Sequence, residues 1–183
     1  MIYVRQSQIH KRVVSIVLFK AEKVDLKNDE LPPEFAFRYW RPGIFNWKPK
    51  GKPLKYYLYT VFHFTGIFKN KSYAYLELMD LDTGIPAASL LIVPAHFKYP
   101  FMKKNDIQFT YVMTKQEYRG KRLAILLLEE AWGQRKDKSG MAWYVTNTDN
   151  TASIRVAEKA GFALEGYGKR ERGMLNRLLK TDS

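Results

Sequence analysis

Two short stretches in the C-terminal half of the chain place the strongest limits on its fold. The first, EYRGKRLA at residues 117–124, is a basic, glycine-containing turn that leads from a strand into a helix. The second, NTASIRVAEKAGF at residues 150–162, opens another helix about thirty residues later. Because the first N–H groups of a helix have no helical partner and the macrodipole is positive there, each helix start can hold an anion. Two such ends, one strand–helix unit apart, could hold an extended, phosphate-bearing ligand.

The wider pattern predicts an α/β or α+β fold with helices packed on one sheet. Strand patterns cover residues 2–6, 13–19, 35–40, 73–79, 87–93, 107–114 and 141–146, and a last strand starts at Phe162. A turn at residues 80–84 predicts a hairpin. Helices are expected over 54–68, although its aromatic residues also suit a strand, and over 121–136. A third, short helix begins after its N-cap Asn150 and ends at Gly161.

The composition favours an anionic partner. The formal net charge is +13, and aromatic residues make up 15% of the 183 residues. Nucleic acid, a membrane surface and a polyphosphorylated cofactor all fit such a charge. The chain is long enough for one domain, with an elaborated N-terminal part over residues 1–70.

Several common sites are excluded or disfavoured by the sequence. There is no cysteine, so disulfides, thiolate metal sites and a cysteine nucleophile are ruled out. The phosphate-loop, nucleophile-elbow and zinc-helix motifs are absent. The three histidines lie far apart in sequence, which favours structural roles. Residues 13–19 read as a strand in preference to a signal peptide, and no apolar run reaches the ~20 residues that span a bilayer.

Together the two stretches resemble the motifs of the GNAT superfamily of acetyl-CoA-dependent N-acyltransferases. The family pattern V-x-P-E-x-R-G-K-G-x-G/A is similar to residues 114–124, and the pattern N-x-x-S-I-R-x-x-E-K-x-G-F matches residues 150–162 almost fully. The resemblance covers roughly residues 72–168. It implies a single GNAT-like domain over residues 1–183. Its expected core is a mixed, mostly antiparallel twisted sheet with splayed middle strands and helices on both faces.

The resemblance also implies how acetyl-CoA, the expected co-substrate, would bind. Main-chain N–H groups of residues 120–124 would cradle the pyrophosphate, and the main chain of residues 112–114 would pair with the pantetheine amides. No metal is implied. The cofactor-binding residues expected on this basis are Val112, Met113, Thr114, Arg119, Gly120, Lys121, Arg122, Leu123, Ala124, Asn150 and Ser153.

The chain departs from the family pattern at two positions. Arg122 stands where the family usually has glycine, so its side chain either crowds the turn or swings outward toward a phosphate. We expect the outward position, because Lys121 and Arg122 together favour an anion. Ala157 stands where the family often has a tyrosine that acts as general acid. That role would pass to Tyr111, Tyr144 or water.

The implied reaction is direct attack of an amine on the thioester, with an N–H near Val112 holding the oxyanion. A base or a water chain must first deprotonate the amine. Asp106 is the first choice for the base, because the family often places it on this strand before the CoA turn. Glu77 and, through water, Thr110 are the alternatives.

The acceptor and two competing functions stay open. Residues 98–106 and 56–68 either roof the acceptor site or form a hairpin connection and a core segment. The first run faintly resembles GNAT-like proteins of surface-polysaccharide assembly, which favours an amino sugar, free or nucleotide-linked, over a protein amine or a polyamine. The competing functions are a nucleic-acid-binding protein on a GNAT-like scaffold and a peripheral membrane protein using residues 56–68. A cytoplasmic location and a homodimer are further expectations.

Overall fold

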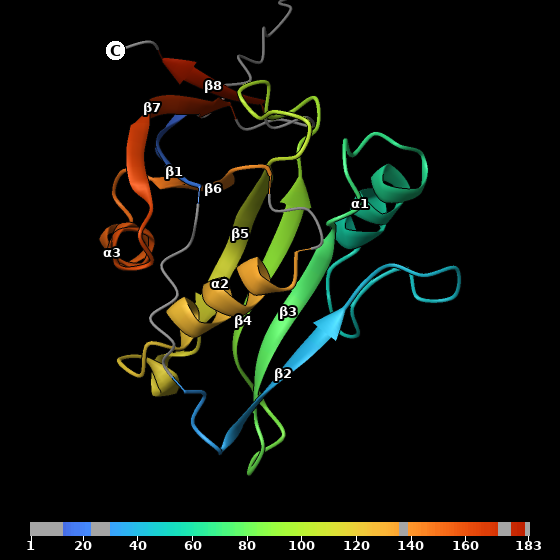
Figure 1. Ribbon diagram of the computed structural model, residues 1–183, viewed down its shortest axis with the longest axis vertical. Helices are drawn as coiled ribbons and strands as arrows, with labels where there is room; N and C mark the ends of the chain where they lie inside the picture. Colours follow the sequence, from blue (N-terminus) through green and yellow to red (C-terminus); the bar gives the residue numbers. More distant parts are fainter. Residues whose placement is uncertain (1–12, 23–29, 136–138, 172–176, 182–183) are drawn as a thin grey trace, which may run out of the picture.

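One mixed sheet organises the molecule. The computed structural model describes residues 13–22, 30–135, 139–171 and 177–181. Within these residues eight strands pair in the order β2-β3-β4-β5-β6-β1-β7-β8 (Figure 1). The strands are β1 (Val13–Ala21), β2 (Phe35–Trp40), β3 (Ala74–Asp80), β4 (Pro86–Pro94), β5 (Ile107–Thr114), β6 (Ala142–Asn147), β7 (Ala163–Glu171) and β8 (Arg177–Thr181).

The strand directions confirm a mixed, mostly antiparallel sheet. Only β5 and β6 run parallel, and the other neighbours are antiparallel. The hairpin expected at residues 80–84 joins β3 to β4. β1 lies between β6 and β7, so an N-terminal strand occupies the interior of the sheet built by the C-terminal half.

The middle of the sheet opens between β5 and β6. Their register includes three pairs, which end at Phe109↔Tyr144, while β5 continues to Thr114. On its other edge β5 carries a bulge, since the pairing with β4 passes from Thr110 to Met113 over a single β4 residue. Tyr111 in this bulge has φ of 51°, in the left-handed region that non-glycine residues rarely adopt. The bulge and the short parallel pairing confirm the splayed middle strands.

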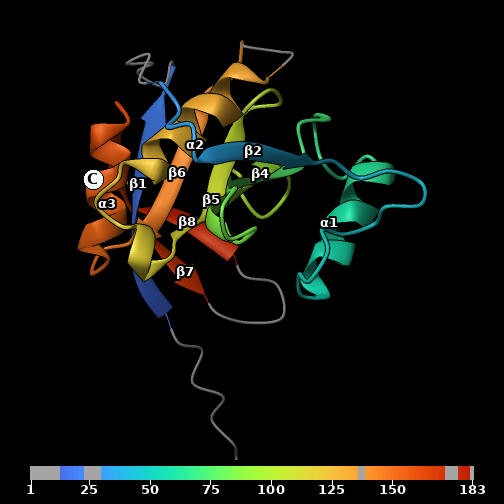
Figure 2. The ribbon, with the colours of Figure 1, turned by 90° about the horizontal axis from the view of Figure 1, so that it is seen from below.

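Helices cover both faces of the sheet, as expected. Residues of α2 (Leu123–Gly133) and α3 (Thr151–Lys159) join the core on one face, together with alternate residues of β3 and β1. Helix α1 (Lys55–Phe64) packs on the opposite face, over Tyr73, Tyr75 and Leu91. Figure 2 shows α1 well separated from α2 and α3. The apolar run at the start of α2 explains its place on the sheet, because six of its first nine residues are buried apolar side chains.

The elements differ from the prediction most clearly in α1, α2 and β8. α1 ends at Phe64 instead of residue 68, because Gly66 has φ of 75° and breaks the helix. α2 begins at Leu123 instead of residue 121, because Arg122 has φ of 59°, and it ends at Gly133, before residue 136. β8 was not predicted. The strand expected over residues 2–6 lies outside the described residues.

Candidate functional site

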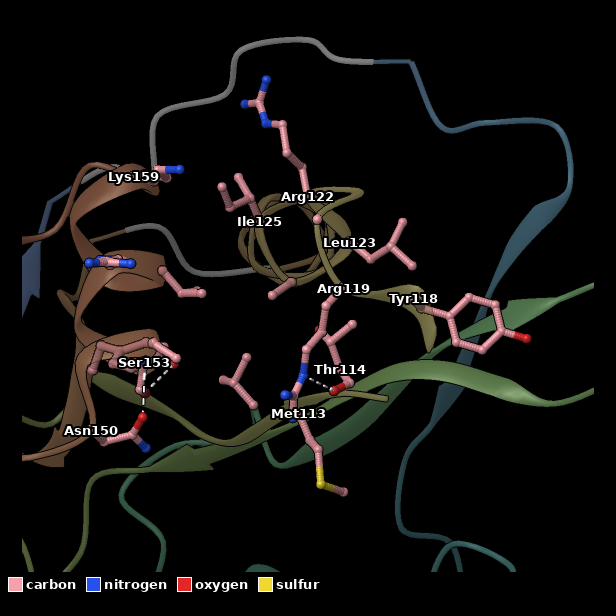
Figure 3. Close-up of a pocket in the computed structure, with 17 residues that line it drawn as sticks. Met113, Thr114, Tyr118, Arg119, Arg122, Leu123, Ile125, Asn150, Ser153 and Lys159 are labelled. Atoms are coloured by element: carbon pink, nitrogen blue, oxygen red, sulfur yellow. Dashed lines mark hydrogen bonds between the residues drawn. The ribbon is translucent and has the colours of Figure 1, made fainter. Parts of the chain in front are cut away.

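A cavity of about 440 Å³ lies where β5 and β6 part. It is lined by the end of β5, the turn that follows, the first residues of α2, and one side of α3 (Figure 3). In Figure 3, Asn150 and Ser153 face Arg119 and Thr114 across it. The cavity therefore joins the two helix starts that the sequence singles out.

The turn between β5 and α2 is fixed by contacts at both ends. It contains a short 3₁₀ segment, Gln116–Tyr118. The Tyr118 hydroxyl donates a hydrogen bond of 2.6 Å to Asp80 Oδ2 at the end of β3, and Arg119 Nε donates one of 3.5 Å to the Thr114 carbonyl. Gly120 has φ of 84°, which glycine adopts without steric cost. The turn thus brings main-chain N–H groups to the cavity in a defined conformation.

Arg122 lies at the rim of the cavity. Its backbone is left-handed at the N-cap of α2, which costs a non-glycine residue about 1 kcal/mol. This conformation explains why glycine would suit the position. In Figure 3 its side chain rises from the helix start, away from the turn. The guanidinium therefore does not fill the space that the turn encloses.

Helix α3 presents one face to the cavity. The Asn150 side chain caps the helix by accepting a hydrogen bond of 3.1 Å from the Ser153 N–H, as the sequence predicts. The hydroxyls of Ser153 and Tyr144 lie 2.9 Å apart. Ala157, in contrast, is fully buried in the core. The position where the family often has tyrosine therefore belongs to the core in this chain.

The cavity is electropositive. Its lining side chains include four cations, Arg119, Arg122, Arg155 and Lys159. Among the described residues that line it there is no carboxylate. Four cations beside two helix N-termini make a strong anion site.

The structure brings together ten of the eleven residues expected to bind the cofactor. The exception is Lys121. Its Nζ lies 5.7 Å from the ring centre of Phe35 and 5.9 Å from that of Tyr118, in cation–π contacts outside the cavity lining.

Asp106, the first choice for the base, is not brought to the cavity. It lies just before β5, at the opposite end of the strand from the turn. Its buried carboxylate accepts hydrogen bonds from the main-chain N–H groups of Lys103 (2.8 Å) and Met141 (2.9 Å) and from Trp143 Nε1 (2.8 Å). This geometry indicates a structural role, because the carboxylate holds together a loop and two strands.

Tyr111 and Glu77 lie on the α1 side of the sheet, away from the cavity lining. Burial, with smaller contributions that include Tyr111, raises the pKa of Tyr99 to about 12, and Tyr99 packs against the core under α1. Tyr111 therefore lies near that aromatic group and outside the cavity lining. Thr110, beside it, is partly buried on β5 and likewise does not line the cavity.

The Glu77 carboxylate is held by cations. It accepts hydrogen bonds from Arg38 and from the Tyr75 hydroxyl (3.0 Å), and Lys52 Nζ lies 3.2 Å away. Burial alone would raise the pKa of Glu77, but the hydrogen bonds from Arg38 and the charge of Lys52 outweigh it and hold the pKa below its usual value. A carboxylate stabilised in this way is a weak base.

Some lining residues were not anticipated from the sequence. They are Tyr118, Ile125, Ala152, Arg155, Val156 and Lys159. Four of them belong to α3 at positions i, i+3, i+4 and i+7, which is the spacing of one helix face. Counted from Ala152, this spacing leads to the two cations, Arg155 and Lys159. No comparable signal marks Tyr118 or Ile125.

Comparison with solved structures defines the class of fold. A GCN5-related N-acetyltransferase from Sphaerobacter thermophilus superimposes with a TM-score of 0.54 at 16% identity, over 85% of this chain and 50% of that one. A GCN5-related N-acetyltransferase-like protein from Streptococcus suis gives 0.53 at 14% identity, over 86% and 60%. A tandem GNAT protein of the clavulanic acid biosynthesis pathway gives 0.54 at 13%, over 88% and 54%. The fold is that of the GCN5-related N-acetyltransferases.

The family model makes the assignment specific. The model of the acetyltransferase (GNAT) family matches residues 26–162. The chain therefore belongs to the GNAT family. A search of the curated proteins found no match. The chain spans about half the length of the first solved chains it matches.

The described residues show neither a cluster of metal ligands nor a membrane-spanning helix. Nowhere in the described ranges do three His, Asp or Glu side chains lie close enough to hold a metal ion. None of the helices in the described part of the chain has both the length and the apolar character needed to cross a membrane.

Proposed function

We propose that this protein binds acetyl-CoA in the cavity between β5, α2 and α3 and catalyses acetyl transfer to a primary amine. The observation that carries the proposal is the cavity itself. It opens at the splayed strands, and residues of both motifs line it. Family membership supports acetyl transfer in general.

The residues present fit the cofactor. The start of α2, with Arg119 and Arg122, suits a pyrophosphate, because N–H groups and guanidinium groups there meet negative charge. The main chain of residues 112–114 and the Asn150 side chain suit the amides of the pantetheine arm. When bound, acetyl-CoA supplies an acetyl group activated as a thioester.

Two groups of the chain can assist the transfer. The main-chain N–H near Val112, in the bulged part of β5, would donate a hydrogen bond to the thioester carbonyl oxygen. Tyr144, the last residue of β6 that pairs with β5, lines the cavity, and its hydroxyl lies 2.9 Å from that of Ser153. Burial raises the pKa of Tyr144, and this effect exceeds the opposite effect of its hydrogen bond to Ser153. The phenol therefore stays protonated and can donate its proton to the departing thiolate, in preference to Tyr111.

Water is the best candidate for removing the proton of the amine. Asp106 is engaged with three N–H donors, and Glu77 is held in its charged form by Arg38 and Lys52. Neither carboxylate lines the cavity. A water chain that leads the proton to solvent from the open mouth of the cavity needs no buried base.

The acceptor class that we propose to test first is an amino sugar, free or linked to a nucleotide. The Tyr111 side chain, in the bulge of β5, is 47% exposed, and aromatic faces stack on sugars and bases. Arg38 and Lys52 stand on the α1 face of the sheet, where cations would suit a diphosphate. A cytoplasmic location is part of this proposal and agrees with the absence of cysteine.

An acceptor panel tests the function. CoA release from acetyl-CoA would be followed with amino sugars, nucleotide-linked amino sugars, a polyamine and a lysine peptide, each against a reaction without amine. We expect amine-dependent release with at least one sugar amine. Absence of release with every amine, together with salt-sensitive oligonucleotide binding, would contradict the proposal and favour a nucleic-acid-binding protein on this scaffold.

A further inference from the structure

Exposed apolar side chains gather in one part of the molecule, the lobe formed by residues 41–67. The described residues include seventeen large hydrophobic side chains that are exposed, and nine of them lie in this lobe. They are Ile44, Phe45, Trp47, Leu54, Tyr57, Leu58, Val61, Phe64 and Ile67. In Figures 1 and 2 the lobe, with α1 and the loop before it, stands out to one side of the sheet. An apolar surface of this kind marks an interaction site.

The tip of the lobe is a small hairpin. Gly43 and Asn46 pair through main-chain hydrogen bonds of 3.0 and 3.2 Å, which leaves Ile44 and Phe45 as its two-residue loop. Phe45 is 99% exposed and Ile44 is 75% exposed. Trp40 Nε1 donates a hydrogen bond of 2.7 Å to the Asn46 side chain. Two large apolar side chains are thus held in solvent by a structured turn.

Helix α1 extends the apolar surface. The exposed residues Tyr57, Leu58, Val61 and Phe64, with Leu54 at the N-cap, follow the spacing of one helix face, while the other side of α1 packs on the sheet. The Trp47 ring lies 5.6 Å from the Phe64 ring, and Thr60 Oγ1 donates a hydrogen bond of 2.6 Å to the Trp47 carbonyl. These contacts join the hairpin to the helix. Hairpin tip and helix face form one surface.

The lobe is also strongly basic. The sequence from residue 35 to residue 76 contains eight Lys and Arg residues and no Asp or Glu. Lys50 is exposed, and Lys48 lies 5.8 Å from the ring centre of Tyr57 on the apolar face. Apolar side chains bordered by cations, without a carboxylate in the segment, match an anionic surface with an apolar interior.

We propose that the lobe of residues 41–67 docks on an anionic lipid bilayer, with Ile44, Phe45 and the exposed face of α1 entering the interface. Several of the exposed side chains are aliphatic, among them Ile44, Leu58 and Val61, which favours a membrane over nucleic acid, since aliphatic side chains do not stack on bases as aromatic rings do. A second copy of the chain is disfavoured, because two such lobes would bring like charges together. Lysines beside the apolar side chains would attract anionic headgroups.

The position of the lobe is compatible with an open cavity. α1 packs on one face of the sheet, whereas α2 and α3 border the cavity on the other. Docking through the lobe would therefore leave the cavity accessible. The inference does not depend on acetyl transfer, because it rests on a different surface.

Vesicle flotation tests the docking. The full chain would be mixed with vesicles of phosphatidylcholine and phosphatidylglycerol, or of phosphatidylcholine alone. We expect flotation with the anionic vesicles only. Phe45→Ser should weaken binding by about tenfold, because a large apolar side chain no longer leaves water. Since Phe45 is 99% exposed, this change should not affect folding. Lys50→Glu should weaken binding by about fivefold or more, and less so at high salt.

Matched variants make the result specific. Leu164→Ser removes another exposed apolar side chain, which is 55% exposed on β7, and Lys169→Glu makes the same charge change at an exposed position of β7. Both should float like the unmodified protein. Failure of the protein to float with anionic vesicles would overturn the proposal. Equal losses in lobe and control variants, or flotation unchanged by Phe45→Ser, would also overturn it. Oligonucleotide binding lost with Phe45→Ser, without flotation, would assign the lobe to nucleic acid instead.

Discussion

The Asp106 carboxylate joins two parts of the chain that are distant in sequence, the loop before β5 and the start of β6. Its two oxygens accept from the loop before β5, from Met141 and from the Trp143 indole. A buried group of this kind stabilises the fold only while its hydrogen bonds are complete. Its position at the closed end of β5 fixes where the two parallel strands begin to pair.

Asp106→Asn should therefore lower stability more than catalysis. An amide offers one acceptor oxygen and places an NH₂ group against N–H donors, which should cost about 3 kcal/mol of unfolding free energy. We expect kcat to be unchanged below the melting temperature, as measured by CoA release and thermal unfolding. Asp82→Asn, at an exposed turn residue, is the control. A folded Asp106→Asn protein with kcat lowered a hundredfold would identify Asp106 as the base.

Tyr144→Phe should lower kcat by roughly a hundredfold, because a proton donor to the leaving thiolate is lost. The acetyl-CoA affinity should change little. Since the pKa of Tyr144 is raised above 10.0, loss of this proton should not reduce wild-type activity below about pH 10. The pH–rate profile and kcat check both points. Tyr111→Phe should keep wild-type kcat, and the reverse pattern would contradict the assignment.

His96 makes stability depend on pH. It is buried among aromatic rings, and burial lowers its pKa from 6.5 to about 4. Between pH 4 and pH 6.5, the His96 imidazole is therefore protonated in the unfolded chain and neutral in the folded chain. The free energy of unfolding consequently falls as the pH falls from 6.5 to 4. The loss should be about 3 kcal/mol. Denaturant unfolding of His96→Phe should show a correspondingly weaker pH dependence than wild type. Identical pH dependence would contradict this account.

At the scale of elements, close backbone packing holds the start of β6 against the end of the loop before β5. A Cβ at Gly140 would lie 2.0 Å from the Asn105 carbonyl oxygen. The Gly140 carbonyl also accepts a hydrogen bond of 2.9 Å from Arg135. Only a residue without a side chain fits there.

Gly140→Ala should destabilise the protein by about 3 kcal/mol, since the backbone must move apart. Gly133→Ala is the matched control, because a Cβ at that position meets nothing within 4 Å. Alanine near the end of α2 should be neutral or stabilise by up to about 1 kcal/mol. Thermal unfolding measures both variants. Equal stability of the two would show that the β5–β6 corner can relax.

The sequence predicted those elements whose patterns are local. Strong periodicity identified the strands, and the Asn150 cap and the apolar start of α2 identified two helices. The place of β1 between β6 and β7 was not predictable, because strand pairing joins residues about 130 apart in the chain. The structural role of Asp106 was not predictable for the same reason, because its hydrogen-bond partner Trp143 lies 37 residues away in the chain. Lys121 matches the motif in sequence, but its side chain contacts the Phe35 ring and does not line the cavity.

At the scale of the whole molecule, the chain divides its charge between two surfaces. The cavity has four cations beside two helix starts, and the lobe of residues 41–67 adds cations around apolar side chains on the opposite side of the sheet. A net charge of +13 therefore does not imply one continuous binding surface for nucleic acid. Two separate anionic partners, a cofactor and a surface, account for it better.

Binding of acetyl-CoA is the most direct test of the cofactor site. At about 100 times the Kd, a ligand adds about 2.7 kcal/mol of stability, which should raise the Tm by roughly 5 °C or more. Arg119→Ala combined with Arg122→Glu should remove most of this shift, whereas Lys121→Ala should keep it, because Lys121 lies outside the cavity lining. A Tm that does not change with saturating acetyl-CoA, in a protein that unfolds cooperatively, would contradict the account.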